Sequence, residues 1–395
     1  MKDLRADFPL LTRHPEIVYL DSACTSLKPQ AVLEAERAYY TDFGACAARS
    51  SHSLGRQASE QVEKAREQVS GFVGARSHEL VWTRNATEAL NLVAFGLDYS
   101  ERRQVVTTEM EHHSVLLPLL RLREEGRIEL EILTADSEGR VPFACWQSAI
   151  GRSTALVVTH GLSNVTGTGQ PVSELAKLAH DAGALLCVDG AQGVPHQKTD
   201  VGRDKIDFLC FSAHKMLGPN GIGALVAPSS QQSRLRPLLA GGGTARSVSL
   251  PKVEQAAGAS RFEAGIQHYA GMLGFAAACA YLRRLGMDEV ERRGRELGIQ
   301  LDEAILAAGG TVYGPSPCLS GLRTFNLPGA KPHNLGLLLD QRHIAVRSGY
   351  FCAQPALNAL GAGGGAVRAS TYVYTSDRDI SRFGDELLRL APLYS

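Results

Sequence analysis

Ser212-Ala213-His214-Lys215 follows the apolar run Asp207-Phe208-Leu209-Cys210-Phe211, and Asp189-Gly190-Ala191-Gln192 follows a similar run at 184–188. Each run is typical of a buried strand, so Asp189 and Lys215 both come at a strand end. This placement suits pyridoxal phosphate, because a lysine can form a Schiff base with the aldehyde while an aspartate keeps the pyridine nitrogen protonated. Taken alone, the pair is weak evidence, because most Asp and Lys residues at strand ends are solvated loop charges, so the surrounding motifs carry the argument.

The first two thirds of the chain alternate short strand patterns with helical patterns. Strands are expected at 79–83, 104–108, 155–159 and 184–188, with helices after the first three. This alternation predicts an α/β fold with a mostly parallel sheet covered on both faces. Ligands of such sheets bind outside the carboxyl ends of the strands, and His112, Asn164, Asp189 and Lys215 all follow expected strands.

Length and pattern predict two domains. The 395 residues exceed the roughly 250–300 at which one core stops growing. After Gly265, helical stretches at 271–285 and 288–308 precede a smaller α/β segment with strands near 320–326, 344–347 and 366–372. We expect a large domain over 15–286, and a small domain formed by 1–14 and 287–395.

Composition excludes several classes of protein. The 41 Lys and Arg residues balance 41 Asp and Glu residues, which argues against nucleic-acid binding and a polybasic membrane contact. No long apolar segment or signal peptide is visible, and the eight cysteines show no C-x-x-C spacing. We expect a soluble cytoplasmic protein with no metal site and no membrane or nucleic-acid partner.

The stretch Arg84-Asn85-Ala86-Thr87-Glu88 joins a strand to a helix and could bind phosphate. Backbone N–H groups at a helix start, with the Thr87 hydroxyl, can hold an anion. An ordinary helix cap fits the same residues. Ser212 and His214, beside Lys215, could supply further donors.

Four other positions have a functional and a structural interpretation. His112 could stack on a planar cofactor and later move protons as a catalytic residue, or it could belong to a polar loop. Asn164 could bind a ring oxygen or a carboxylate, or it could form a turn. Arg368 lies in a β-like run, where a substrate carboxylate or an internal salt bridge would satisfy it. Cys352, in a loop with little side-chain bulk, could be a mobile nucleophile or a free structural cysteine.

Together these motifs resemble the class V aminotransferases, which are fold-type I pyridoxal-phosphate enzymes, and within them the SUF-type (group II) cysteine desulfurases. The resemblance runs from Tyr19 to the C-terminal helix. Its motifs are Tyr19-Leu20-Asp21-Ser22-Ala23, Thr87-Glu88, Met110-Glu111-His112-His113, Ser163-Asn164-Val165-x-Gly167-Thr168, Val188-Asp189-Gly190-Ala191-Gln192, Ser212-x-His214-Lys215, Arg261-Phe262-Glu263-Ala264-Gly265 and Arg347-x-Gly349-x-x-Cys352-Ala353.

The resemblance implies a large domain with a seven-stranded type of sheet, a smaller α/β C-terminal domain and a set of cofactor ligands. Lys215 would bind the cofactor covalently, Asp189 would pair with the pyridine nitrogen, Gln192 would donate to the ring hydroxyl and His112 would stack on the ring. The phosphate would be held by Ala86, Thr87, Ser212 and His214.

The resemblance also implies the reaction. L-Cysteine, with its carboxylate on Asn164 and Arg368 and with Arg49 as a further active-site arginine, would be converted to L-alanine. Its sulfur would pass to Cys352 as a persulfide, whose thiolate Arg347 could favour, and then to a sulfur-acceptor protein. A homodimer is implied, and iron–sulfur cluster assembly is one of the open destinations of the sulfur.

Two departures from the family pattern bear on the substrate. Ile266 stands where a threonine commonly donates to the phosphate across the dimer, and Ala48 stands where many relatives have histidine. The alternatives are a selenocysteine lyase, another C–S lyase, an epimerase, or a non-catalytic scaffold subunit. The intact Arg347-x-Gly349-x-x-Cys352 loop favours the desulfurase.

Overall fold

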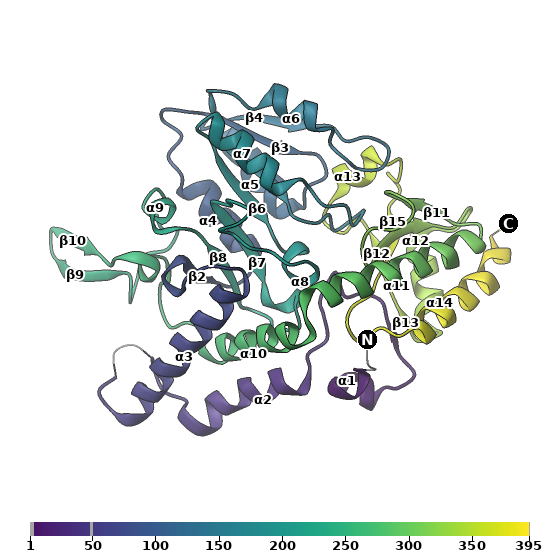
Figure 1. Ribbon diagram of the computed structural model, residues 1–395, viewed down its shortest axis with the longest axis horizontal. Helices are drawn as coiled ribbons and strands as arrows, with labels where there is room; N and C mark the ends of the chain where they lie inside the picture. The colour runs from purple at the N-terminus through teal and green to yellow at the C-terminus, as the bar shows by residue number, and fades with distance from the viewer. Residues whose placement is uncertain (1–3, 48–49, 395) are drawn as a thin grey trace.

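The computed structural model describes residues 4–47 and 50–394, and a seven-stranded sheet forms its centre (Figure 1). The strand order is β2 (Leu80–Thr83), β8 (Gly223–Val226), β7 (Phe208–Ser212), β6 (Leu185–Asp189), β5 (Thr154–His160), β3 (Gln104–Thr108) and β4 (Glu129–Leu133). The five strands from β7 to β4 run parallel, whereas β8 runs antiparallel to both of its neighbours. The mostly parallel sheet expected from the sequence is confirmed.

Both faces of this sheet are buried, which explains the continuous apolar runs of its central strands. In β6, Leu186 belongs to the core on one face and Cys187 to the core on the other, as the alternation of a strand requires. The first face is covered by α3 (Ser53–Phe72), α7 (Val172–Asp181) and α10 (Tyr269–Leu285). The second is covered by α4 (Ala86–Gly96) and α5 (His113–Glu124).

A four-stranded antiparallel sheet forms the core of the C-terminal part. Its order is β11 (Thr311–Tyr313), β12 (Leu322–Asn326), β15 (Ala366–Ser370) and β14 (Arg347–Gly349). Apolar residues of α11 (Met287–Ala307), α12 (Pro332–Asp340) and α14 (Asp377–Leu390) pack in the same core. The smaller α/β segment is therefore present.

The strand expected at 344–347 is divided between two sheets. β13 (Ile344–Ala345) pairs in parallel with β1 (Val18–Tyr19), and β14 then joins the four-stranded sheet beside β15. Because of this pairing, Val18 and Leu20 pack in the core of the smaller sheet.

The domain boundary expected after residue 286 falls between α10 and α11, which are separated by Gly286. The division into 15–286 and 1–14 with 287–395 stays a prediction. The remaining helices and strands are α1 (Pro9–Arg13), α2 (Gln30–Ala38), α6 (Phe143–Ala149), α8 (Gly193–His196), α9 (Ser229–Gln232), β9 (Ala245–Ser249), β10 (Lys252–Gln255) and α13 (Gln354–Ala359).

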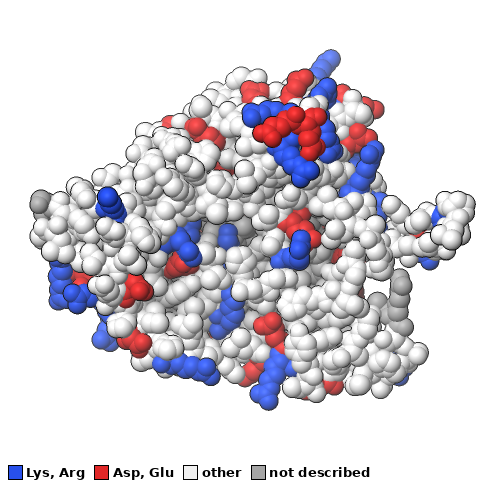
Figure 2. All heavy atoms as spheres, turned by 180° about the vertical axis from the view of Figure 1, so that it is seen from behind, with Lys and Arg blue, Asp and Glu red and all other residues white. Residues whose placement is uncertain are grey.

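The surface has two features of note. The β9–β10 hairpin projects from the body at the left of Figure 1, and its Leu250 side chain is 98% exposed. On the face seen from behind, acidic and basic side chains are interspersed (Figure 2).

Within the described ranges, no helix has the length and apolar character needed to cross a membrane.

Candidate active site

The carboxyl ends of the parallel strands surround a cavity of about 390 Å³. β6 ends at Asp189, β7 ends at Ser212, and a 3-10 turn at Ala213–Lys215 follows directly. The cavity is lined by every sequence-predicted site residue that the structure describes, namely Ala86, Thr87, His112, Asn164, Asp189, Gln192, Ser212, His214, Lys215, Cys352 and Arg368. Arg49, and Ala48 before it, lie outside the described residues.

Asp189 and Lys215 influence each other electrostatically at the centre of this cavity. Asp189 is 6% exposed, and its Oδ1 accepts a hydrogen bond of 3.0 Å from the Ala191 N–H. Burial raises the pKa of Asp189, and the Lys215 charge offsets part of that rise. Burial likewise lowers the pKa of Lys215, against the opposing effect of Asp189. A lysine whose pKa is lowered gives up its proton more readily and is a better nucleophile.

The start of α4 combines a helix cap with polar groups that line the cavity. Asn85 caps the helix, because its Oδ1 accepts the Glu88 N–H at 3.0 Å. The Ala86 N–H donates to Ser212 Oγ at 2.8 Å, and the Thr87 and Ser114 hydroxyls lie 2.7 Å apart. Asn85 therefore acts as the helix cap, whereas the Ala86 N–H and the Thr87 hydroxyl remain candidates for binding an anion.

A glycine lets β8 approach this helix start closely. A Cβ atom on Gly223 would lie 2.7 Å from the Asn85 Cα atom, a distance that no side chain tolerates. Gly223 therefore helps to place the first turn of α4 against the end of β7, where Ser212 meets Ala86.

His112 is the N-cap residue of α5, and its ring is neutral. Its Nδ1 accepts the Ser114 N–H at 3.0 Å, so this nitrogen carries no proton in that bond. Burial, together with the charge of Lys215, lowers the pKa of His112 to about 3. Burial lowers the pKa of His214 to about 4 in the same way. An uncharged imidazole is suited to lie against a flat aromatic ring.

Arg368 is a buried cation with unused donor capacity. It is 3% exposed, and its Nη1 donates to the Asn164 carbonyl at 2.9 Å. Its Nη2 lies 3.9 Å from Asp21 Oδ1, while its Nε has no hydrogen-bond partner among the described residues. Burial lowers the pKa of Arg368 to about 10. A long contact with Asp21 leaves the guanidinium able to bind a second anion.

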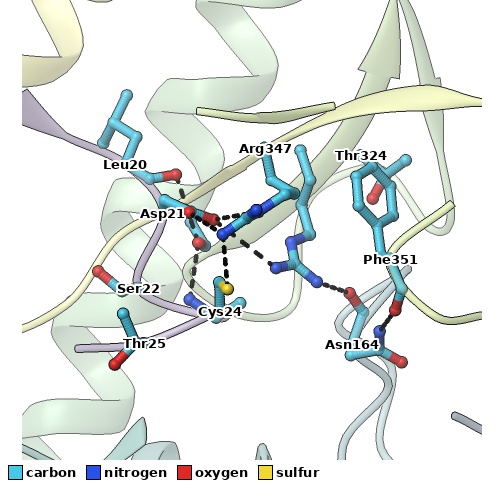
Figure 3. Close-up of polar contacts among 12 residues, drawn as sticks. Leu20, Asp21, Ser22, Cys24, Thr25, Asn164, Thr324, Arg347 and Phe351 are labelled. Atoms are coloured by element: carbon cyan, nitrogen blue, oxygen red, sulfur yellow. Dashed lines mark hydrogen bonds and ion pairs between the residues drawn. The ribbon is translucent and has the colours of Figure 1, made fainter. Parts of the chain in front are cut away.

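Arg347 contacts a different cysteine from the one expected. Its Nη2 lies 2.7 Å from Asp21 Oδ2 and also donates to the sulfur of Cys24 (Figure 3). Among the described residues, Arg347 makes no hydrogen bond to Cys352, so the expected stabilisation of the Cys352 thiolate has no direct contact behind it. Sequence reasoning missed Cys24, although it directly follows the Tyr19–Ala23 motif.

The Cys352 loop is attached to the large sheet through its backbone. The Cys352 carbonyl accepts the His113 N–H at 2.7 Å, and the Phe351 carbonyl accepts Asn164 Nδ2 at 3.0 Å. The Arg368 guanidinium lies 4.9 Å from the centre of the Phe351 ring. Phe351 and Cys352 both have left-handed backbones, with φ of 53° and 55°, and the Cys352 side chain is exposed.

A buried acid–histidine pair beside Asp189 was also missed. Glu111 Oε1 lies 2.9 Å from His160 Nδ1 and accepts a 2.8 Å hydrogen bond from the Thr108 hydroxyl. Burial opposes protonation of His160, but the Glu111 carboxylate outweighs it and raises the pKa. Little in the sequence pointed to this pair. Glu111 was noted only as part of the Met110–His113 motif, and His160 only follows the strand expected at 155–159.

The polar groups of this cavity fit pyridoxal phosphate. Gln192 is 2% exposed, and its Oε1, like Arg368 Nε, has no hydrogen-bond partner within the described part of the chain. Such buried atoms indicate a missing polar ligand, because orphaned buried groups are costly. A buried carboxylate and a lysine at strand ends, with a helix start nearby, match the ring nitrogen, aldehyde and phosphate of this cofactor. In residues 4–47 and 50–394, no cluster of three or more His, Cys, Asp or Glu side chains could hold a metal ion.

Comparison with known proteins agrees with this geometry. The family model "Aminotransferase class-V" matches residues 18–383. A probable cysteine desulfurase from Methanothermobacter thermautotrophicus is 38% identical over 99% of this chain and 98% of its own length.

Solved structures agree as well. The apo cysteine desulfurase of Thermococcus onnurineus NA1 superposes with a TM-score of 0.95 at 37% identity, over 99% of this chain and 98% of its own. The Escherichia coli cysteine desulfurase CsdA (S-sulfonic acid) gives 0.91 at 31%, with the same coverage of both chains. The fold-type I architecture is confirmed, and the chain belongs to the class V aminotransferase family.

Proposed function

We propose that this protein is a pyridoxal-phosphate-dependent cysteine desulfurase, which converts L-cysteine to L-alanine and transfers the sulfur to Cys352 as a persulfide. One observation carries the proposal: a single cavity brings together Lys215, Asp189, Arg368 and Cys352. Relatives of nearly the same length, at 36–38% identity, carry this name.

Pyridoxal phosphate supplies an electron sink that labilises the Cα proton and weakens the bond between Cβ and sulfur of a bound amino acid. Lys215 attaches the cofactor and afterwards moves the Cα proton with its Nζ. Asp189 would keep a positive charge on the pyridine nitrogen, Gln192 would donate to the ring hydroxyl and His112 would cover the ring face. The phosphate would be held by Ala86, Thr87, Ser212 and His214.

A second set of residues in the cavity is proposed to bind the substrate. Arg368 and Asn164 hold the carboxylate of L-cysteine, and Arg49 is assigned to the same task. The Cys352 thiolate attacks the substrate sulfur, so that the new S–S bond forms as the bond between Cβ and sulfur breaks. The electron pair of the broken bond stays with the three-carbon fragment, which is protonated and released as L-alanine. A lyase or an epimerase needs no such acceptor thiol, which is why Cys352 in this cavity favours a desulfurase.

The assembly is proposed to be a homodimer in the cytoplasm. Ile266 is 75% exposed and lines a second cavity of about 720 Å³ together with Ala257, Tyr269 and Met272. An apolar side chain so exposed at the rim of a cavity supports an isologous contact over this surface. Ile266 can offer the neighbouring site only its backbone, because its side chain has no hydroxyl group. A fully active monomer in sedimentation at micromolar concentration would contradict the dimer.

The substrate assay tests the function directly. Purified protein with bound cofactor is given L-cysteine, L-selenocysteine or L-cysteine sulfinate, and alanine is measured from each. Alanine from L-cysteine, with sulfur on Cys352, supports the desulfurase. Alanine from L-selenocysteine alone would favour a selenocysteine lyase. A non-catalytic scaffold would lack the absorbance band of the bound cofactor.

The sulfur-acceptor protein is defined only by its chemistry. It must present a thiol able to attack the outer sulfur of the Cys352 persulfide, and the exposed position of Cys352 permits that approach.

A further inference from the structure

Two of the eight cysteines line the active-site cavity, and all eight lie among the described residues. These two are Cys24 and Cys352. Cys46 is exposed and lines a different cavity, while the others are Cys145, Cys187, Cys210, Cys279 and Cys318, of which the last four are buried. The proposed reaction uses Cys352 and leaves Cys24 without a role.

Cys24 is held firmly in place. Its N–H donates to the Asp21 carbonyl at 3.1 Å, and the preceding Ala23 N–H donates to Ser370 Oγ at 2.9 Å. Its half-buried sulfur accepts a hydrogen bond from Arg347 Nη2, which also contacts Asp21 Oδ2 (Figure 3). These contacts fix the position of the Cys24 sulfur at the cavity wall.

Cys352 differs from Cys24 in its exposure. Its side chain is exposed, and its loop lies between Gly349 and a glycine-rich run at 361–365. Cys24 can receive sulfur only from a group that reaches the same cavity, and Cys352 is the other thiol that lines it.

Both thiols lie near the same two cations. Burial lowers the pKa of Lys215 and of Arg368, and the sulfurs of Cys24 and Cys352 each offset part of that lowering. Phe351, next to Cys352, stacks on Arg368, whose Nη2 faces Asp21. Arg368 is 3% exposed, and its Nε, unpartnered in the described chain, indicates that a ligand enters between these groups.

We propose that Cys24 is a second sulfur-bearing thiol, which takes the sulfane sulfur from Cys352 and holds it inside the cavity. This inference rests on the proposed function, because it requires a persulfide on Cys352. The Cys24 thiolate attacks the outer sulfur of that persulfide, so a new S–S bond forms at Cys24 as the S–S bond of Cys352 breaks. The proton of the Cys24 thiol ends on the Cys352 sulfur, and no external oxidant or reductant is needed.

The exchange returns Cys352 to its reduced form while the sulfur stays on the enzyme. Cys352 can then accept sulfur from a second L-cysteine before any acceptor protein arrives. One chain can therefore store a sulfane sulfur on each of two thiols.

The stored sulfur is measurable as a burst of alanine. Protein with bound cofactor is given only a few equivalents of L-cysteine and no other thiol, and alanine formed in the initial burst is counted per chain before free L-cysteine removes the stored sulfur. The wild-type burst should be about twice that of Cys24→Ser and of Cys24→Ala. Cys46→Ser, which removes an exposed thiol outside the cavity, should give the wild-type burst. Equal bursts in wild type and in both Cys24 variants would overturn the proposal.

Peptide mapping then locates the sulfur after alkylation of the loaded protein. Wild type should carry sulfane sulfur on Cys24 and Cys352, and Cys352→Ser should carry none on Cys24. Sulfur on Cys24 in Cys352→Ser would overturn the order of transfer, and a polysulfide on Cys352 alone would overturn the second site. Equal labelling of Cys46 and Cys24 would mean exchange through solution and would also overturn it. These outcomes differ from a failure of the proposed function itself, in which the wild-type protein would form neither alanine nor persulfide.

Discussion

The backbone N–H of His113 donates a 2.7 Å hydrogen bond to the carbonyl oxygen of Cys352. His113 is the first residue of α5, so this N–H has no partner within its own helix. The loop that follows β14 of the smaller sheet thus supplies an acceptor to a helix of the large sheet. Because the bond uses the backbone of Cys352, a change of its side chain should leave the loop attached.

Cys352→Ser should therefore retain the cofactor while losing sulfur transfer. We expect alanine formation from L-cysteine to fall by about 10³-fold or more, because the acceptor thiol is removed. Turnover of L-selenocysteine should fall less, since selenium can leave without an attacking thiol. Alanine release and the cofactor absorbance band are the two measurements, with Cys46→Ser as the matched control. Unchanged L-cysteine turnover would point to a lyase.

Lys215→Ala should abolish covalent attachment of the cofactor. Borohydride reduction of the wild-type protein should fix the cofactor on the peptide that contains Lys215, as detected by mass spectrometry. The variant should show no such adduct, whereas Lys198→Ala, which changes an exposed lysine, should retain it. A label on another lysine in the wild type would make the assignment wrong.

Arg368→Lys should weaken recognition of the substrate carboxylate and leave cofactor binding intact. A lysine cannot reproduce the planar fork of a guanidinium, and a charged hydrogen bond contributes about 1.5–3 kcal/mol. We expect kcat/KM for L-cysteine to fall by about 10²-fold, with the same change at the exposed Arg389 as control. A variant with wild-type kcat/KM would show that Arg368 has a structural role only.

His196 should make stability dependent on pH. Burial, with the charge of Lys215, lowers the pKa of His196 to about 4, and its ring packs edge-on against Tyr372. Above the unfolded value of about 6.5 its contribution to the free energy of unfolding is fully present, and it is lost as pH falls from there towards 4. By pH 5 the loss should be about 1–2 kcal/mol.

His196→Gln should remove this pH dependence. Urea unfolding midpoints of wild type, His196→Gln and the exposed-site control His78→Gln are compared at pH 7.5 and pH 5. The drop between the two pH values should be smaller in His196→Gln than in the other two proteins. An equal drop in all three would contradict the assignment.

The sequence predicted what depends on local pattern. Strands and helices around the large sheet follow from continuous apolar runs and helical periodicity, and Asp189 and Lys215 follow from the rule that ligands bind at the carboxyl ends of parallel strands. Most of the polar residues proposed to hold cofactor and substrate could therefore be named beforehand, whereas Cys24 and His160, which also line the cavity, were not.

What the sequence did not predict depends on contacts between distant segments. Asp21 and Arg347 lie 326 positions apart, and their contact depends on the way the chain leaves β13 for β14. No periodicity marks that change of sheet, so Arg347 was assigned to the cysteine near it in sequence and not to Cys24. The Glu111–His160 pair likewise depends on how the residues after β3 approach the end of β5.

The left-handed backbones of Phe351 and Cys352 lower the stability of the folded protein. At Cys352 the same residue supplies the thiol for sulfur transfer, so stability and activity make opposite demands on it. A non-glycine residue in that region costs about 1–2 kcal/mol, and a glycine at position 352 would avoid the cost. Laboratory selection for heat resistance alone would therefore favour replacement of the side chain that first receives the sulfur. A library screened for robustness should be screened at the same time for sulfur transfer, because the most stable members will be enriched in inactive ones.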